Sequence, residues 1–252
     1  MSADQYLLNI LAREHVDNGL ASPVRSVQAA LTPALNAWGN GYIVAVHPSG
    51  SFAKGTANHS GTDIDLFISL TETLTDPMKQ IYDTLFNQMT QRGFNPKRQN
   101  VSINVRVNSY SVDLVPARRQ NGHSHDHTLY RRKADTWTKT NVITHINHVA
   151  HSGCVNEIRI IKLWRNQKGL DFPSFYLELT AMAALAGRYG TLSQRVWIIL
   201  EYLRDRFPTA RVVDPANTNN VISDDLTAQE HARISAAARA ALAATNWSQI
   251  VT

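Results

Sequence analysis

Acidic and apolar residues alternate in the stretch Asp63-Ile64-Asp65-Leu66, and this pattern constrains the fold more than any other feature of the chain. Alternate residues of a β-strand point to the same face, so a strand over residues 63–69 directs both carboxylates one way and Ile64 and Leu66 into a core. Neighbouring carboxylates repel unless a cation lies between them, and Mg²⁺ takes such ligands together with phosphate oxygens. The stretch predicts a metal and phosphate site; a polar strand end at a turn is the alternative.

A glycine-serine turn precedes the acidic pair. The apolar run at residues 42–46 indicates a buried strand, which we expect Pro48-Ser49-Gly50-Ser51 to end. Backbone N–H groups of the following turn can face an anion, and Ser51 offers a hydroxyl to a terminal phosphate. A Gly-Ser pair is ordinary loop chemistry by itself. Its place before the two carboxylates makes it informative.

A third carboxylate, Asp113, lies in an apolar setting. Residues 101–107 and 110–115 alternate in the manner of two strands, and Asn108-Ser109 between them indicates a hairpin turn. Asp113 is in the second arm, among Val112, Leu114 and Val115. An isolated carboxylate is costly there, so a partner is expected, and a bridging metal supplies one.

These motifs, taken in order, resemble a known family. Gly50-Ser51, Asp63-Ile64-Asp65 and the run from Val112 to Pro116 look like the signature of the polymerase-beta-type nucleotidyltransferase superfamily. Residues 157–164, 172–179 and 214–221 are similar to the helical half of its oligoadenylate-synthase-like and bacterial cyclic-dinucleotide-synthase-like (cGAS/DncV-like) branch. Archaeal-type CCA-adding enzymes share much of the pattern. The resemblance extends from about residue 49 to residue 221.

The resemblance implies two-metal catalysis with pyrophosphate release. Asp63, Asp65 and Asp113 would hold two Mg²⁺ ions, for which Mn²⁺ can substitute. Asp63 and Asp65 would contact both ions, and Asp113 would contact only the ion that activates the attacking hydroxyl; Asp113 is also a candidate base. The implied substrates are ATP or other nucleoside triphosphates, and the residues that would bind the triphosphate are Gly50, Ser51, Lys162 and Ser174.

Two of these nucleotide-binding residues have structural alternatives. Lys162 lies beside the apolar face of a helix expected at residues 156–167, where a surface lysine is the other interpretation. Ser174 precedes a helix expected at residues 175–188, with Glu178 four residues on, so an N-cap is the other interpretation. An N-cap hydroxyl beside a phosphate would satisfy both roles.

Basic and aromatic residues suggest further ligands. The formal net charge is +5, and two clusters, Arg118-Arg119 and Arg131-Arg132-Lys133, suit nucleotides or an RNA or DNA strand; a solvated charged face is the alternative. Candidates to stack on a base are Tyr130, Trp137 and Tyr176, for which a core or rim position is the simpler interpretation. Whether a partner protein activates the enzyme is left open.

The histidines allow a zinc hypothesis that their spacing does not favour. His123, His125 and His127 alternate within a segment whose Gly122, Ser124 and Asp126 indicate an exposed loop. His145, His148, His151 and Cys154 recur every third residue, so on a helix they spread over about half its circumference. Whether either set binds metal is left open.

Cysteine content and hydropathy bear on location. Cys154 is the single cysteine, which excludes a disulfide within the chain and fits a reducing compartment. The first residues carry an acid and no basic cluster, so no signal peptide is expected. No window has the roughly 18 uninterrupted apolar residues of a membrane span. We expect a cytoplasmic protein with no membrane partner.

The periodicity predicts an α/β part followed by an all-α part. The resemblance implies that these are an α/β nucleotidyltransferase catalytic lobe with a small mixed β-sheet and a helical lobe, with the active site in the cleft between them. The catalytic lobe, with N-terminal helices, covers residues 1–140 and the helical lobe residues 141–252. Asp214 is expected to turn the chain in a loop before the last helix. The expected helices are 4–16, 24–38 with Pro33 inside it, 77–92, 141–150, 156–167, 175–188, 192–207 and 224–245.

The leading hypothesis is a template-independent nucleotidyltransferase that makes a cyclic or short linear oligonucleotide messenger from nucleoside triphosphates, as bacterial relatives do in antiphage defence. One alternative is nucleotide addition to an RNA or transfer-RNA 3′ end, and another is a catalytically silent nucleotide or RNA sensor. The same motif residues occur in proteins with each of these functions, so they do not discriminate between the three hypotheses. They leave open the bases used, the 2′-5′ or 3′-5′ linkage, cyclic or linear product, the activator and the oligomeric state.

Overall fold

The computed structural model describes residues 1–17, 19, 22–61 and 63–252, and its contacts divide the chain into two compact units. The sheet unit consists of Val16–Lys54 and Thr62–Asn147. The helical unit consists of Met1–His15, Gly55–Gly61 and His148–Thr252. The division expected from sequence lies at one point, after residue 140, whereas the contacts place the first helix and a short internal segment with the C-terminal helices.

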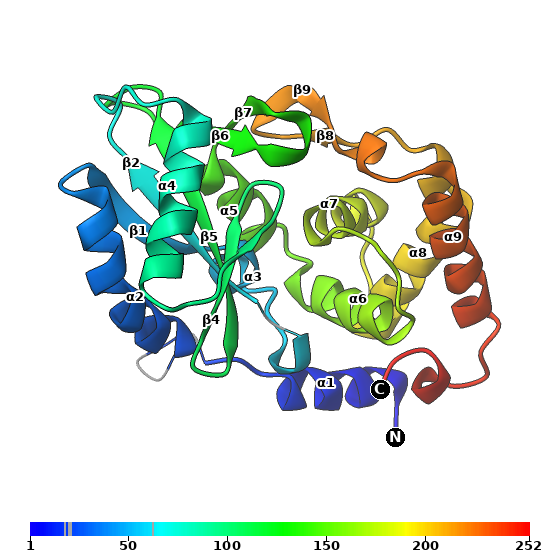
Figure 1. The fold of residues 1–252 in the computed structure, drawn as a ribbon. Coiled ribbons are helices and arrows are strands. Elements are labelled where there is room, and N and C mark those ends of the chain that lie inside the picture. The colour runs from blue at the N-terminus through cyan, green and yellow to red at the C-terminus, as the bar shows by residue number, and fades with distance from the viewer. Residues whose placement is uncertain (18, 20–21, 62) are drawn as a thin grey trace. The chain divides into compact units, whose positions relative to one another are not determined.

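A mixed β-sheet forms the centre of the sheet unit (Figure 1). Its strands are ordered β1, β2, β5, β4, β3, and β6 and β7 extend it from the distal end of β5. β2 and β5 are parallel and the other neighbours are antiparallel. The strands are β1 (Ile43–Ser49), β2 (Ile64–Leu70), β3 (Lys97–Arg98), β4 (Ile103–Val107), β5 (Tyr110–Arg119), β6 (His127–Arg131) and β7 (Thr136–Thr140).

Two amphipathic helices, α2 (Pro23–Gly39) and α4 (Met78–Gln91), pack against one face of this sheet (Figure 1). The apolar residues of β4, Ile103, Val105 and Val107, are buried, whereas Asn104 and Arg106 alternate to the other face and are more exposed. Near the C-terminal ends of β2 and β5, a small hydrophobic cluster covers the other face of the sheet. This cluster includes Val142, the first residue of α5 (Val142–Ala150). One face therefore builds the core, and part of the other stays open.

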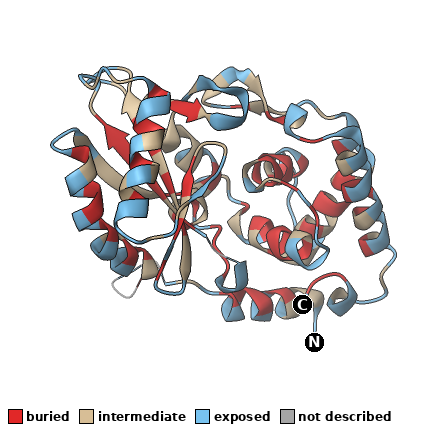
Figure 2. Ribbon diagram, in the orientation of Figure 1, coloured by how far each residue is buried: buried red, intermediate tan, exposed pale blue. Residues whose placement is uncertain are grey.

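The helical unit has its own apolar core, whose largest fully buried side chains are Trp164, Tyr176, Phe172 and Phe207. The helix α7 is buried over most of its surface, as Figure 2 shows in red. Its neighbours contribute amphipathic faces. The helices are α1 (Ala3–Arg13), α6 (Val155–Gln167), α7 (Ser174–Leu185), α8 (Leu192–Asp205) and α9 (Ala228–Leu242).

The segment 55–61 belongs to the helical unit although it connects two elements of the sheet unit, α3 (Gly50–Lys54) and β2. Arg159 holds it: Nε donates to the Ala57 carbonyl and to Asn58 Oδ1, both at 3.1 Å, and Nη2 donates to the Glu14 carbonyl at 2.8 Å. Asn58 in turn donates to the Arg159 carbonyl at 2.9 Å. Ala57 and Asn58 are thus fixed by hydrogen bonds to α6 within the helical unit.

The structure confirms the expected helices within a few residues at most ends, and α2 continues through Pro33. The first strand is longer than the expected residues 42–46, since β1 continues through Pro48 to Ser49 and ends within the Pro48-Ser49-Gly50-Ser51 stretch that was expected to end it. β1 pairs with β2 alone, and an edge strand tolerates proline. The strand is also not buried as expected, because Val44 is 46% exposed.

The expectation of helices throughout the C-terminal part is wrong at one place. A hairpin of β8 (Val213–Asp214) and β9 (Asn217–Val221) replaces the expected loop. Buried Asp214 accepts hydrogen bonds from the Ala216 N–H at 2.8 Å and from the Asn220 amide at 3.2 Å. This residue therefore stabilises the turn, in line with the structural role expected for it.

His127 does not lie in an exposed loop, as its neighbours' composition suggested. It is buried in β6, with Nε2 2.8 Å from Ser69 Oγ and Nδ1 2.8 Å from the His125 carbonyl. The His125 carbonyl can only accept a hydrogen bond, so Nδ1 of His127 carries a proton, and burial lowers the pKa of His127, which favours the neutral imidazole. In that form Nε2 accepts a hydrogen bond from the Ser69 hydroxyl, which itself accepts one from Arg119 Nε.

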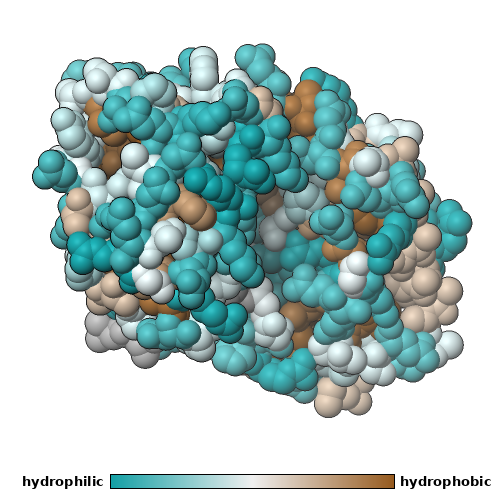
Figure 3. All heavy atoms as spheres, viewed as in Figure 1, coloured by the Kyte–Doolittle hydropathy of each residue, from teal (hydrophilic) through white to brown (hydrophobic). Residues whose placement is uncertain are grey.

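Polar side chains predominate on the face shown in Figure 3, and apolar ones are scattered over it. Within the part of the chain that the structure describes, no helix is long and apolar enough to cross a membrane.

Candidate active site

Asp65 and Asp113 lie opposite each other on the parallel strands β2 and β5. The same register continues to both sides, with Ser49 of β1 opposite Asp65 and Asn104 of β4 opposite Asp113. Register partners share one face of a sheet, so these four side chains form a row across it. Ile64, Leu66, Val112 and Leu114 alternate to the opposite face and are fully buried. The alternation predicted from sequence is confirmed.

Asp63 directly precedes β2 and is exposed, two residues before half-buried Asp65. Its charge contributes to raising the pKa of Asp113. Burial is the largest cause of that raised pKa, and the Asn104 amide opposes it by donating a hydrogen bond to the carboxylate. Asp63 and Asp113, two of the three carboxylates predicted from the sequence, are therefore electrostatically coupled.

A divalent cation fits this donor set in charge and in ligand type. All the donors are carboxylate oxygens, two of them from register partners, and the repulsion between Asp63 and Asp113 is the kind that a bound cation relieves. Among the described residues, no three His, Cys, Asp or Glu side chains are already gathered closely enough to hold an ion. The backbone thus brings the carboxylates together, and metal binding requires their side chains to adjust.

Two amides hold Asp113, and the sequence analysis singled out neither. Asn104 Nδ2 donates to Asp113 Oδ1 at 2.7 Å, and Gln99 Nε2 donates to the same oxygen at 3.1 Å. Ser102 Oγ donates to Gln99 Oε1, and Tyr82 Oη and Arg132 Nε donate to the Gln99 carbonyl. Gln99 is therefore fixed by its surroundings. The orientation of Asp113 is set through Oδ1.

Gly50 begins the short helix α3 with φ of +56°, a conformation that glycine adopts most readily. A Cβ at this position would overlap the Asp65 carboxylate. The glycine therefore lets the turn pass directly against Asp65. Ser51 follows it and is half-buried, and its hydroxyl has no hydrogen-bond partner among the described residues.

Lys162 is buried within the helical unit, so the surface-lysine interpretation is wrong. Its Nζ donates to the Thr56 carbonyl at 3.1 Å and lies 3.9 Å from Glu178 Oε1. Glu178, only 1% exposed, also accepts a hydrogen bond from Thr56 Oγ1 at 2.8 Å. The helix α6 is buried on several sides rather than one, which explains why a lysine beside its apolar face is enclosed.

Ser174 is the first residue of α7, and Pro173 holds the N-cap position, so the N-cap interpretation of Ser174 is wrong. Arg165 Nη1 donates to Ser174 Oγ at 2.9 Å and to the Phe172 carbonyl at 2.7 Å. Burial lowers the pKa of the Arg165 guanidinium. The serine hydroxyl is thus positioned by a guanidinium that the sequence analysis did not identify.

The two basic clusters differ in structure. Arg118 Nη1 donates to the carbonyls of Leu74 and Asp76, and Arg119 Nε donates to Ser69 Oγ, so this pair is engaged inside the sheet unit. Arg132 and Lys133 are exposed in a short turn between β6 and β7. Of the aromatic candidates for base stacking, Tyr130 and Tyr176 are buried and Trp137 is 58% exposed. Of these three candidates, only Trp137 has an accessible ring.

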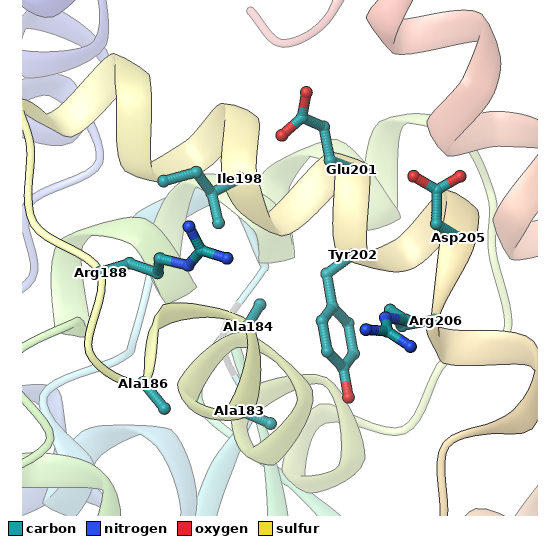
Figure 4. Close-up of a pocket in the computed structure, with 9 residues that line it drawn as sticks. All are labelled: Ala183, Ala184, Ala186, Arg188, Ile198, Glu201, Tyr202, Asp205 and Arg206. Atoms are coloured by element: carbon teal, nitrogen blue, oxygen red, sulfur yellow. The ribbon is translucent and has the colours of Figure 1, made fainter.

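A pocket of about 360 Å³ lies within the helical unit, between the end of α7 and the helix α8. Figure 4 shows Arg188 and Arg206 on either side of Tyr202, with Ala183 and Ala184 on the Arg188 side of the ring. Charges of both signs line it, since Glu201 and Asp205 are present as well. None of the residues that the sequence analysis singled out lines this pocket.

No protein-family model matches the chain, and no curated protein matches it significantly. Solved structures do match. CdnC, in a complex with HORMA-deltaN from E. coli MS115-1, superposes with a TM-score of 0.75 at 18% identity, over 95% of this chain and 89% of CdnC. The CdnE cyclic dinucleotide synthase of Elizabethkingia meningoseptica, solved with GTP and Apcpp, gives a TM-score of 0.70 at 14% identity, over 94% of this chain and 97% of CdnE.

RNA-modifying enzymes share the fold as well. The Cid1 poly(U) polymerase, solved with MgATP, gives a TM-score of 0.70 at 13% identity, over 95% of this chain and 93% of Cid1. Identities this low establish a common fold and no more. The predicted fold class, an α/β part with a mixed sheet followed by a helical part, is thereby confirmed as the fold of these structures.

Proposed function

We propose that this chain is a template-independent nucleotidyltransferase that joins nucleoside triphosphates into a cyclic or short linear oligonucleotide messenger and releases pyrophosphate. The observation that carries the proposal is the placement of Asp65 opposite Asp113 on parallel strands, with Asp63 two residues before Asp65. This placement occurs on a fold shared with CdnC and with a cyclic dinucleotide synthase. Carboxylates on one face of a sheet are what two-metal chemistry requires, and this supports the proposal.

Asp63, Asp65 and Asp113 are the proposed ligands of two Mg²⁺ ions. When bound, such ions lower the pKa of an attacking hydroxyl and neutralise charge on the triphosphate. The Asn104 and Gln99 amides hold Asp113 through Oδ1. Burial raises the pKa of Asp113, which makes its carboxylate a better acceptor for the proton of the attacking hydroxyl.

Gly50, Ser51, Lys162 and Ser174 are the proposed triphosphate ligands. Gly50 keeps the turn against Asp65, and the Ser51 hydroxyl is available for a phosphate oxygen. The Arg165 guanidinium positions the Ser174 hydroxyl. Lys162 is held by Thr56 beside Glu178, an arrangement that fixes its ammonium before any ligand binds.

A role in antiphage defence in the cytoplasm and regulation by a partner protein are further parts of the proposal. The resemblance to the bacterial cyclic-dinucleotide-synthase-like branch supports the role, and the complex of CdnC with HORMA-deltaN supports regulation by a partner.

Addition of nucleotides to an RNA 3′ end is the second candidate, because the fold is shared equally with a poly(U) polymerase. The same three carboxylates would serve both reactions, and the acceptor would differ.

The test is incubation of the purified protein with all four labelled ribonucleoside triphosphates and Mg²⁺ or Mn²⁺, with and without transfer RNA, followed by phosphatase treatment, chromatography and mass analysis. A small phosphatase-resistant product made without RNA supports messenger synthesis. Label found only on RNA favours terminal addition. Product that persists in the Asp63→Ala/Asp65→Ala variant contradicts the proposal. Absence of product in every arm points to a missing activator, or, together with tight RNA binding, to a sensor.

A further inference from the structure

The row of side chains that contains Asp65 and Asp113 continues to the far edge of the sheet. Asn104 of β4 is opposite Asp113, and Lys97 of β3 is opposite Asn104. Strands lie about 4.8 Å apart, so Lys97 starts roughly 10 Å from the Asp113 backbone and shares its face. Exposure increases along the row, from half-buried Asp113 and Asn104 to exposed Lys97.

A second cation lies on the same face. Arg106 is two residues after Asn104 on β4 and opposite Ser111, which is two residues before Asp113 on β5. By strand alternation, Arg106 and Asn104 point the same way. Lys97 and Arg106 therefore flank Asn104, the amide that holds Asp113 Oδ1.

Neither cation has a structural task. Both side chains are exposed, and neither side chain has a hydrogen bond or an acidic partner among the described residues. Arg98, the neighbour of Lys97 on the opposite face, forms an ion pair with Asp83 and lies over the Phe86 ring of α4. The α4 side of this sheet edge is thus packed and charge-paired, whereas the Asp113 side carries two uncompensated positive charges.

Two unpaired positive charges beside the half-buried Asp113 carboxylate favour binding of a polyanion that extends outward from Asp113. In the proposed reaction Asp113 faces the attacking hydroxyl, which belongs to the acceptor, so groups immediately beyond Asp113 along the row would meet the acceptor's own phosphates. The donor triphosphate has other proposed ligands, beginning with Gly50 and Ser51 on the β1 side of Asp65. The row is therefore polar and anionic at its centre and cationic at the β3 edge.

We infer that Lys97 and Arg106 form a subsite for the phosphate groups of the acceptor, the nucleotide chain whose hydroxyl attacks. This inference rests on the proposed function for the identity of the acceptor. The subsite recognises phosphate and not the base, because a lysine ammonium and an arginine guanidinium are both phosphate ligands. A short oligonucleotide intermediate and an RNA 3′ end present the same chemistry.

Metal-free binding tests the subsite without any need for turnover. Two radiolabelled probes are used in equilibrium dialysis, a 5′-phosphorylated diadenylate and a single-stranded RNA decamer. The test variant is Lys97→Gln/Arg106→Gln. Its matched control is Arg25→Gln/Arg92→Gln, which removes two exposed arginines from α2 and the end of α4, the helices that cover the opposite face.

The test variant is expected to bind at least one probe roughly 5- to 30-fold more weakly than the wild type, while the control binds as the wild type does. Between about 50 and 200 mM salt, the slope of log affinity against log salt should fall by about 0.7 for each lost phosphate contact. Weakening confined to the diadenylate identifies a short acceptor, and weakening confined to the decamer identifies an RNA end.

Equal binding by the test variant and the wild type overturns the inference, as does a wild type that binds neither probe. Equal weakening in the control also overturns it, because net charge alone would then explain the effect. These outcomes do not depend on catalysis. If the protein turns over nucleotides but the test variant binds both probes as the wild type does, the proposed function stands and the proposed subsite is wrong.

Discussion

Gly50 lies directly against the Asp65 carboxylate, and a single Cβ at Gly50 would occupy the space that this carboxylate fills. The turn after β1 and the acidic residue of β2 are therefore fitted to each other. The contact explains why a Gly-Ser turn accompanies the acidic pair, since any larger residue would displace the carboxylate or the turn. Its backbone conformation, with φ of +56°, adds a second requirement for glycine.

Gly50→Ala is expected to abolish most turnover, by at least about 100-fold, because displacement of a catalytic carboxylate by about 1 Å has that effect. Gly93→Ala is the matched control: Gly93 also has positive φ, +80°, but a Cβ there meets nothing within 4 Å. Both variants should lose about 1–2 kcal/mol of stability from backbone strain. Initial rates and thermal unfolding measure the two effects; equal turnover in the two variants would show that the contact with Asp65 is unimportant.

Asp113→Asn is expected to stabilise the metal-free protein at neutral pH while abolishing turnover. Burial and the Asp63 charge raise the pKa of Asp113, so the folded state holds this proton more tightly than the unfolded state does. In the wild type, this contribution favours folding at low pH and is lost as pH rises from the ordinary value of 3.8 through the raised pKa. Urea unfolding against pH checks the sign. A variant that is less stable than the wild type at pH 7 without metal would contradict it.

The Lys162 and Glu178 side chains should be strongly coupled. Removing either charge leaves the other buried, so Lys162→Met and Glu178→Gln should each cost about 3–5 kcal/mol in the free energy of unfolding. The double variant should lose less than the sum, by about 1–3 kcal/mol. Denaturant unfolding of the four proteins gives this coupling energy. Strict additivity would mean that the 3.9 Å pair contributes nothing beyond its separate contacts.

His127 should make the protein less stable in mild acid. Burial lowers its pKa below the ordinary value of 6.5, so the unfolded chain takes up a proton first, and stability is lost as pH falls through 6.5. His127→Gln should reduce this loss, although His47, whose pKa burial also lowers, retains part of it. Exposed His123→Gln is the control. Unfolding curves between about pH 7 and pH 5 measure the slope, and an unchanged slope in His127→Gln would rule out this role.

Some of the site follows from local pattern. A two-residue turn at Asn108-Ser109 pairs Val107 with Tyr110, and counting outward then pairs Asn104 with Asp113. The amide that orients Asp113 was therefore available from the hairpin register. The pairing of β2 with β5 was not, because no local rule brings together parallel strands so far apart in sequence.

Other features depend on packing that sequence periodicity does not report. Lys162 is enclosed because α6 is buried on several sides, and its partner Glu178 comes from a different helix. The β8–β9 hairpin has an asparagine-rich second strand without apolar alternation, so the period-2 signal is absent. The assignment of segment 55–61 to the helical unit depends on Arg159, which lies about 100 residues away.

The most direct test of the central claim is the Mg²⁺-dependent release of pyrophosphate from nucleoside triphosphates, since this product is common to messenger synthesis and terminal addition. The assay compares the wild type with Asp65→Asn and with the exposed control Asp224→Asn, in Mg²⁺ and after chelation. We predict release by the wild type and the control, no release without metal, and a loss of at least about 1,000-fold in Asp65→Asn. Release at the wild-type rate by Asp65→Asn would contradict the assignment of the active site to the row containing Asp65 and Asp113.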